Sequence, residues 1–94
     1  MAIIEDPEGF EATALRAAVP SFDDLRVLEV GAGSGRLTRH FAGRARSIVA
    51  IDPDEDAIAD LRLEFPHVDA RAVGIEALDL DPHSVDVVIF AWSL

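Results

Sequence analysis

Apolar residues along this chain recur in two alternating patterns, short continuous runs and stretches with a helical period. The runs are rich in β-branched residues, and Gly, Pro and Asp separate them from the helical stretches, which is typical of alternating strands and helices. The predicted elements, in chain order, are a leading helix from Glu8 to Pro20, a strand at 26–30, a short helix with an apolar stripe at Leu37, Phe41 and Ala45 that ends near Gly43, a strand at 47–51, a helix through Ala57, Ile58, Leu61 and Phe65 closed by Pro66, a strand at 68–73, a loop at 74–82 and a strand at 85–92.

This order of elements predicts an α/β domain built on a doubly wound parallel sheet. Parallel strands need right-handed crossovers, and one economical arrangement places the four strands in the order 3-2-1-4. The fourth strand, which is the most apolar, then lies at an edge, where it could associate with another chain. We expect one domain over 1–94, with the leading helix and a linker at 1–25 and a β-α-β-α-β-loop-β unit at 26–94.

Composition narrows the partners of this chain. Its 94 residues are 50% hydrophobic, which suits a small globular domain. The formal charge is −10, with eight Arg and no Lys, and such a field repels nucleic acid and anionic membranes. We expect no nucleic-acid or membrane contact from this portion and, with neither a signal-peptide pattern nor a membrane-spanning apolar run, a cytoplasmic location. The acidic, Lys-free composition fits either high salt or codon bias, and the lack of Cys excludes thiol chemistry.

The strand at 26–30 runs directly into a glycine cluster at 31–35, and this junction is the main candidate for a ligand site. Glycines let the backbone turn sharply there and let a ligand approach the main chain near free N–H groups. A dinucleotide fingerprint would need its third glycine where Arg36 stands. Glu29, two residues before the first glycine, would repel a pyrophosphate and favours a ligand that carries positive charge.

A resemblance to a known family starts at this junction. The first motif of class I, Rossmann-like S-adenosylmethionine-dependent methyltransferases is similar to the stretch Val-Leu-Glu-Val-Gly-Ala-Gly-Ser-Gly at 27–35. The resemblance covers 27–94 and implies the N-terminal, cofactor-binding half of such a domain, without the half that holds the methyl acceptor. It implies that the loop binds the methionine end of S-adenosylmethionine, whose ammonium and sulfonium are positive. The expected binding residues of this loop are Glu29, Gly31, Ala32, Gly33 and Gly35.

Asp52 ends the second strand, at the place from which a carboxylate in a doubly wound sheet reaches a ribose. Its two oxygens suit two vicinal hydroxyls. The alternative is helix capping, since Pro53 could occupy the first helical position. Resemblance to the second motif of the family favours cofactor binding by Asp52 and Pro53. We expect Glu29 and Asp52, at two neighbouring strand tips, to face one shared cleft.

The third region of the family supplies an acidic side chain to the adenine amino group and a backbone N–H to the ring. The matching positions are Gly74 and Ile75, so the acid is missing, while Ile75 would offer its N–H and an apolar wall. Glu76 could replace the acid, but because it lies two residues further along the loop we expect backbone and packing contacts instead. In the fourth strand we interpret Asp86 as structural and Phe90 as lining the pocket near the methyl group.

These observations predict an enzyme that transfers the methyl group of S-adenosylmethionine to a nucleophile. No catalytic base can be named, and no metal site is expected because the three histidines lack metal-motif spacing. Trp92-Ser93 does not match the loop of many amino-directed nucleic-acid methyltransferases, which favours a small-molecule acceptor and leaves a protein or RNA open. The alternatives are a non-catalytic S-adenosylmethionine-binding module and a fragment of an NAD-binding oxidoreductase, which Arg36 and Glu29 disfavour.

Overall fold

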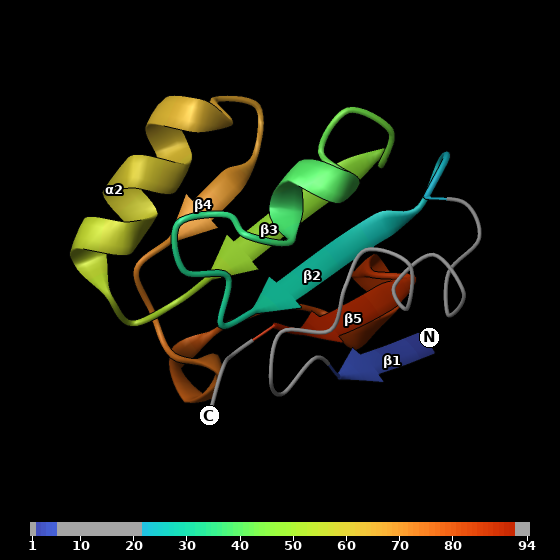
Figure 1. Cartoon of the computed structure of the whole chain (residues 1–94). Helices are drawn as coiled ribbons and strands as arrows, with labels where there is room; N and C mark the ends of the chain where they lie inside the picture. The colour runs from blue at the N-terminus through green and yellow to red at the C-terminus, as the bar shows by residue number, and fades with distance from the viewer. Residues whose placement is uncertain (1, 6–21, 92–94) are drawn as a thin grey trace.

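Glycines and prolines divide the chain into short elements, and the computed structural model arranges them around one sheet (Figure 1). The structure describes residues 2–5 and 22–91, so the leading helix predicted between Glu8 and Pro20 lies outside the described residues, as do Trp92 and Ser93. The elements, in chain order, are β1 (Ala2–Glu5), β2 (Arg26–Val30), the 3-10 turn η1 (Thr38–His40), β3 (Ser47–Ile51), α2 (Glu55–Glu64), β4 (Asp69–Arg71), the 3-10 turns η2 (Ile75–Ala77) and η3 (Pro82–Ser84), and β5 (Val87–Phe90).

The strands form one parallel sheet in the order β1-β5-β2-β3-β4, and all the arrows point the same way in Figure 1. The four predicted strands are β2, β3, β4 and β5, so the predicted α/β class and the strand order 3-2-1-4 are confirmed. Strands β2 and β3 have the predicted bounds, whereas β4 and β5 are shorter than predicted. The two strands that flank the glycine cluster were therefore the most predictable ones.

Strand β5 does not lie at the edge of the sheet, and the prediction that it would is wrong. Strand β1 pairs with it in parallel, from Ala2 opposite Val87 to Glu5 opposite Phe90, while β2 pairs with its other side. The four residues of β1 are too few to be predicted as a strand from their sequence alone. They form a strand because they pair with the apolar strand β5, and this pairing satisfies the backbone groups at that edge of β5. The β5 edge is therefore not available for pairing with another chain in this arrangement.

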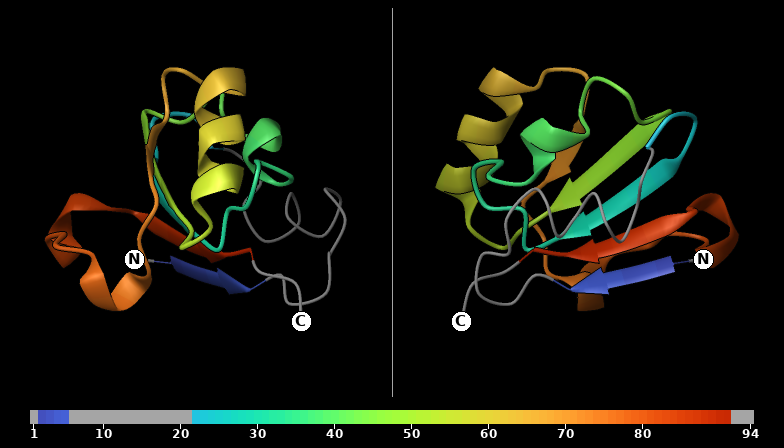
Figure 2. Two further views of the ribbon diagram at one scale, coloured as in Figure 1. Left: turned by 90° about the vertical axis from the view of Figure 1, so that its left-hand side faces the viewer. Right: turned by 45° about the vertical axis from the view of Figure 1, so that its right-hand side comes forward.

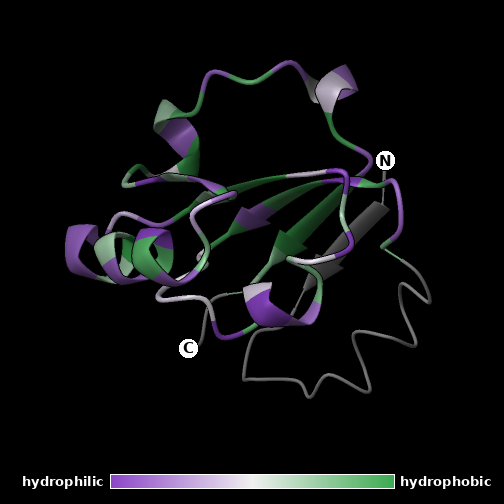
Figure 3. Cartoon of the chain, turned by 90° about the horizontal axis from the view of Figure 1, so that it is seen from above, coloured by the Kyte–Doolittle hydropathy of each residue, from purple (hydrophilic) through white to green (hydrophobic). Residues whose placement is uncertain are grey.

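Two apolar layers cover the two faces of the sheet, because successive side chains of a strand point to opposite sides. One layer packs against α2 and the turns that follow the glycine cluster, and the other packs against 78–85. Figure 2 shows α2 and the η2–η3 segment on opposite sides of the sheet, and Figure 3 shows hydrophobic colour concentrated in the strands. The first layer includes Val27, Ile48, Ala50, Val87, Ile89, Leu37, Phe41, Ile58 and Leu61; the second includes Leu28, Val30, Ile51, Val85 and Val88.

Helix α2 forms where the sequence places a cap, an apolar stripe and a stop. The Asp54 carboxylate accepts hydrogen bonds from two backbone N–H groups of the first turn, at 3.0 and 3.1 Å. Two acidic residues in that turn favour the positive end of the helix dipole. The helix ends shortly before Pro66, which cannot continue it, and Ile58 and Leu61 are fully buried on its inner side. The predicted second helix is confirmed.

The short helix predicted after the glycine cluster is wrong as an α-helix. Only η1 is helical there, and the Thr38 carbonyl accepts from both the third and the fourth N–H group after it, at 3.1 and 2.9 Å. Glycines at 35 and 43 leave too few residues between them to stabilise an α-helical nucleus. The predicted apolar stripe is nevertheless confirmed, because Leu37 and Phe41 are buried and Ala45 packs against the same layer.

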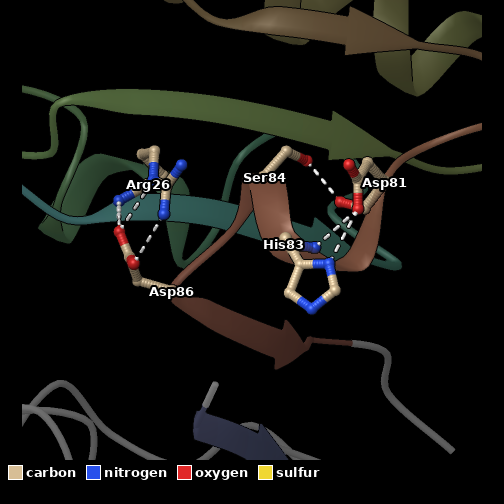
Figure 4. Close-up of polar contacts among 5 residues, drawn as sticks. All are labelled: Arg26, Asp81, His83, Ser84 and Asp86. Atoms are coloured by element: carbon tan, nitrogen blue, oxygen red, sulfur yellow. Dashed lines mark hydrogen bonds and ion pairs between the residues drawn. The ribbon is translucent and has the colours of Figure 1, made fainter.

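An ion pair joins the beginnings of β2 and β5 (Figure 4). The Asp86 carboxylate accepts from the Arg26 backbone N–H at 2.8 Å, from its Nε at 3.1 Å and from its Nη2 at 3.0 Å. These bonds lower the pKa of Asp86 to about 2. Just before it, the Asp81 carboxylate accepts from the backbone N–H of His83 at 2.9 Å, and Ser84 Oγ donates to the Asp81 carbonyl. Asp86 therefore has the structural role that the sequence predicts.

Leu61 and Leu63 offer a matched test of the face that α2 buries. Leu61 is 0% exposed and Leu63 is 84% exposed. We expect Leu61→Ala to lower the free energy of unfolding by about 2–5 kcal/mol, because it leaves a cavity against the sheet. Leu63→Ala should change it by less than about 0.5 kcal/mol. Urea unfolding followed by circular dichroism measures both, and equal effects would contradict this packing of α2.

Candidate functional site

The glycine loop follows β2 and is held against the end of β3 by main-chain hydrogen bonds. The N–H groups of Gly31 and Ala32 both donate to the carbonyl of Ile51, at 2.9 and 3.0 Å. Gly33 and Gly35 have φ values of +58° and +109°, in the region that residues with a Cβ rarely adopt. The loop therefore turns sharply over the two strand ends and keeps its backbone close to them.

Glu29 lies in β2 below this loop and is fully buried. Its Oε1 accepts from Thr38 Oγ1 at 2.5 Å, whereas its Oε2 has no hydrogen-bond partner among the described residues. Burial raises the pKa of Glu29 to about 7, and the Thr38 hydrogen bond and the charge of Arg36 only partly oppose this shift. Glu29 therefore links β2 to the turns that follow the loop, from the inside of the fold.

Asp52 follows β3 and lies beside the glycine loop. Its Oδ2 accepts from the N–H of Gly33 at 3.0 Å, and its Oδ1 accepts from the N–H of Asp54 at 2.9 Å. The side chain that caps α2 belongs to Asp54, so the alternative in which Asp52 is the helix cap is wrong. A carboxylate has about four acceptor positions, and these two bonds leave room for a ligand to donate to Asp52.

A pocket of about 410 Å³ opens at the carboxyl ends of β2 and β3, between them and the segment that leads into η2. Its size is in the range of small-molecule sites, and open parallel sheets bind ligands at this end. Its walls are mostly apolar, with carboxylates contributed by two different elements. The lining residues are Val30, Gly31, Ile51, Asp52, Pro53, Val73, Gly74, Ile75 and Glu76.

The pocket brings together half of the predicted cofactor-binding residues, namely Gly31, Asp52, Pro53, Gly74 and Ile75. The rest lie outside its lining: Glu29, Ala32, Gly33, Gly35 and Phe90. The expectation that Glu29 and Asp52 face one shared cleft is wrong. Residue 29 points to the same side of β2 as Val27, into the apolar layer under α2, because alternate residues of a strand share a face.

The sequence reasoning missed the apolar walls of the pocket. Val30 and Ile51 are partners in the β2–β3 register and the last residues of their strands, and Val73 faces them. The signal for the first two was present in the sequence, since the final residues of two paired parallel strands stand at the same edge. Glu76, which was not among the predicted cofactor-binding residues, also belongs to the lining.

Outside this pocket, the described residues offer little further ligand chemistry. Among residues 2–5 and 22–91, no group of three or more His, Asp or Glu side chains is placed to hold a metal ion. Over the same ranges, no helix is both long and apolar enough to span a bilayer. A second hollow, of about 280 Å³, lies outside the glycine loop and is lined by Ser34, Gly35, Arg36, Arg39 and Glu64.

The raised pKa of Glu29 makes stability depend on pH. Between pH 4.5 and about 7 the unfolded chain loses this proton while the folded chain keeps it, so stability falls as pH rises. Above pH 7 the free energy of unfolding has fallen by roughly 3 kcal/mol from its value below pH 4.5.

Glu29→Gln cannot lose this proton. We therefore expect the free energy of unfolding of Glu29→Gln, relative to that of wild type, to rise by up to that amount between pH 4.5 and pH 8. Urea unfolding across this range measures the difference, with exposed Glu64→Gln as control, and a pH-independent difference would contradict the assignment.

Two glycines of the loop differ in the space around them. A Cβ at residue 33 would meet nothing within 4 Å, whereas one at residue 35 would lie 2.8 Å from the Phe65 ring. Both positions have positive φ, and backbone strain on alanine is larger at residue 35, because +58° lies in the left-handed region and +109° lies outside it. We expect Gly35→Ala to destabilise the fold by at least about 1 kcal/mol more than Gly33→Ala, measured by thermal unfolding. Equal melting temperatures would contradict the close packing of the loop on Phe65.

Comparison with known proteins identifies the family. The sequence profile of the family described as a methyltransferase domain matches residues 27–94. An uncharacterized methyltransferase-like protein of Schizosaccharomyces pombe is 41% identical over 66 residues, which are 69% of this chain and 26% of that protein. A probable S-adenosylmethionine-dependent methyltransferase of Mycobacterium tuberculosis is 40% identical over 63 residues, 67% of this chain and 23% of that protein. The chain thus spans about a quarter of the length of these curated relatives.

Solved structures of methyltransferases share the fold of this chain. Phosphoethanolamine N-methyltransferase 1 of Haemonchus contortus, in complex with phosphoethanolamine and S-adenosylhomocysteine, has a TM-score of 0.72 and 25% identity over 81% of this chain and 17% of its own. An S-adenosylmethionine-dependent methyltransferase of Mesorhizobium loti has a TM-score of 0.72 and 26% identity, over 83% of this chain and 37% of its own. The 23S rRNA methyltransferase ErmE has a TM-score of 0.61 and 28% identity, over 82% of this chain and 34% of its own. This chain therefore belongs to the class I S-adenosylmethionine-dependent methyltransferase domain family.

Proposed function

We propose that this chain forms the cofactor-binding part of an S-adenosylmethionine-dependent methyltransferase that acts on a small-molecule acceptor. The observation that carries the proposal is the place of Asp52, a carboxylate with spare acceptor positions on the rim of a mostly apolar pocket. A nucleoside presents the matching features, which are two vicinal hydroxyl donors and a flat, weakly polar base.

The residues present fit this cofactor. Asp52 can accept from the ribose hydroxyls while the backbone N–H groups of Gly33 and Asp54 hold its carboxylate in place, and neither bond involves the Asp54 side chain. Gly31 lines the pocket without a side chain, so a ligand can approach its main chain. Val73 and Ile75 offer apolar surface to a base. The pocket thus supports a nucleoside with its sugar at the end of β3.

When bound, the cofactor would supply a methyl group on a positively charged sulfur: a bond from the acceptor's nucleophile to the methyl carbon would form in line as the methyl–sulfur bond breaks, and S-adenosylhomocysteine would leave as a neutral thioether. The chain's own part is to bind and to orient. Asp52 fixes the sugar, and the glycine loop sets how closely the main chain approaches the ligand. Glu29 acts indirectly, because its hydrogen bond to Thr38 holds the turns after the loop against β2. No catalytic base is assigned to this chain.

The acceptor is the less constrained half of the proposal. The similar solved structures include one named for phosphoethanolamine and one named for 23S rRNA, so the shared fold does not choose between small and large acceptors. The charge of −10 favours the small molecule, since a field of this sign repels the phosphates of a nucleic acid.

Calorimetric titration of the chain with S-adenosylhomocysteine and with NAD tests the ligand class. We expect heat with the first and none with NAD, because Arg36 stands where a dinucleotide-binding loop needs its third glycine. Absence of heat with S-adenosylhomocysteine at millimolar concentration would overturn the proposal. Binding without turnover on any acceptor would support the non-catalytic module instead.

Asp52→Ala should weaken binding of S-adenosylhomocysteine by about 1–3 kcal/mol, roughly 5- to 150-fold in Kd, because the ribose hydroxyls lose a charged acceptor. Asp54→Ala is the matched control. It removes the cap of α2 and should cost about 1 kcal/mol of stability while leaving affinity within about twofold. Equal affinity of Asp52→Ala and wild type would remove Asp52 from the site.

A further inference from the structure

Two polar side chains, Glu29 and Thr38, lie in the apolar layer under α2, and both residues are fully buried. Thr38 Oγ1 donates to Glu29 Oε1, while Glu29 Oε2 has no hydrogen-bond partner among the described residues. The register neighbours of Glu29 are Ala50 in β3 and Ile89 in β5, which carry no polar side-chain group. A carboxyl group in this place is tolerated when it is neutral, because an unpartnered buried charge costs far more than an unpartnered hydroxyl.

Few charges face the Glu29 carboxyl group. Helix α2 packs apolar residues against this layer, and the charged side chains of the helix are exposed. The segment 36–42, which runs over Glu29, brings one charge that acts on it, that of Arg36. Since Arg36 only partly offsets the effect of burial, a proton is the main means of neutralising this group. The other charged or titratable residues of the segment are Arg39 and His40.

The segment 36–42 is held by short turns, in which the N–H groups of Phe41 and Ala42 donate to the Thr38 carbonyl. The bond between Thr38 and Glu29 ties the middle of the segment to β2. Turns of this kind open at lower cost than the paired strands of a sheet. Because the glycine loop runs directly into the segment, a displacement of 36–42 also displaces the end of that loop.

We propose that Glu29 and Thr38 form a proton-dependent latch, whose effect on the cofactor rests on the proposed function. The neutral carboxyl group holds 36–42 on the sheet. Loss of its proton to solvent releases the segment and the end of the glycine loop, so that water reaches Oε2. Thr38 is a positioning residue in this latch, because it acts on the loop through Glu29.

The direction of the pH dependence follows from burial. In the closed form burial raises the pKa of Glu29 from 4.5 to about 7, and contact with water in the released form reverses this shift. The equilibrium constant for release should therefore rise by up to about 300-fold between pH 4.5 and pH 7 and stay level above pH 7. A small domain has little stability to spare, so a factor of this size is enough to populate the released form.

Hydrogen exchange of the Phe41 and Ala42 amides measures the release. In wild type we expect their protection factors, corrected for the pH dependence of free amides, to fall at least about tenfold from pH 5 to pH 7, while amides of β3 stay at least about tenfold more protected. Glu29→Gln cannot ionise and should keep constant protection, and Glu64→Gln, at an exposed residue of α2, should behave as wild type. Protection that does not depend on pH in wild type, or that is equal at Phe41 and in β3, would overturn the latch.

Two variants of Thr38 separate positioning from packing. The Thr38 hydrogen bond lowers the pKa of Glu29, against the effect of burial. Thr38→Val keeps the shape of the side chain and removes this bond, so the titration midpoint of the Glu29 carboxyl carbon, followed by NMR, should move to higher pH. Thr38→Ser keeps the hydroxyl and should keep the wild-type midpoint. Equal midpoints in Thr38→Val and wild type would contradict the role of Thr38.

Binding of S-adenosylhomocysteine tests the consequence for the cofactor. Between pH 5.5 and pH 8 its Kd should rise at least about threefold more in wild type than in Glu29→Gln, a comparison that cancels titration of the ligand and of the histidines. The same pH dependence in both proteins would overturn the link between the latch and the cofactor. Failure of both proteins to bind at either pH would overturn the proposed function, whereas hydrogen exchange, which needs no ligand, decides the latch separately.

Discussion

The parallel pairing of β2 with β3 is the constraint on which the site depends. Their register ends with Val30 opposite Ile51, so the glycine loop and Asp52 leave the sheet at the same edge and side by side. Two main-chain hydrogen bonds from the loop to Ile51 and one from Gly33 to the Asp52 carboxylate then fix them together. A register shift of one residue would turn every side chain of β3 to the opposite face of the sheet. It would also move Asp52 away from the glycine loop.

Spacing along the chain located this edge but not the direction of each side chain. The β-branched runs at 26–30 and 47–51 predicted both strands with their exact bounds, because such runs suit strands buried on two faces. Glu29 shows where that reasoning fails. Its distance from the first glycine suggested a ligand contact, whereas its place in the alternation of β2 sends it inward to Thr38. The assignment of the pocket consequently depends on Asp52 and on the family match, and not on a pair of carboxylates.

The predictions of an edge position for β5 and of a helix after the glycine loop failed because contacts between distant segments decide both. Strand β1 is four residues long and gains its partner from β5, more than 80 residues away in sequence, which no local pattern reveals. The turns after the glycine loop keep the apolar period of a helix without its regular hydrogen bonds, since burial of Leu37 and Phe41 requires only that they face the sheet. Periodicity therefore predicted which residues are buried better than it predicted the backbone that buries them.

The segment 73–76 shows why spacing along the chain is a weak guide to where a loop places its side chains. Counted along an extended chain, Glu76 stands two residues beyond Gly74. In the fold, residues 75–77 form a 3-10 turn, and the Glu76 carboxylate lies over Gly74, in the space that a side chain at residue 74 would fill. Side-chain direction in this segment therefore follows from the turn, which no periodic pattern of apolar residues predicts.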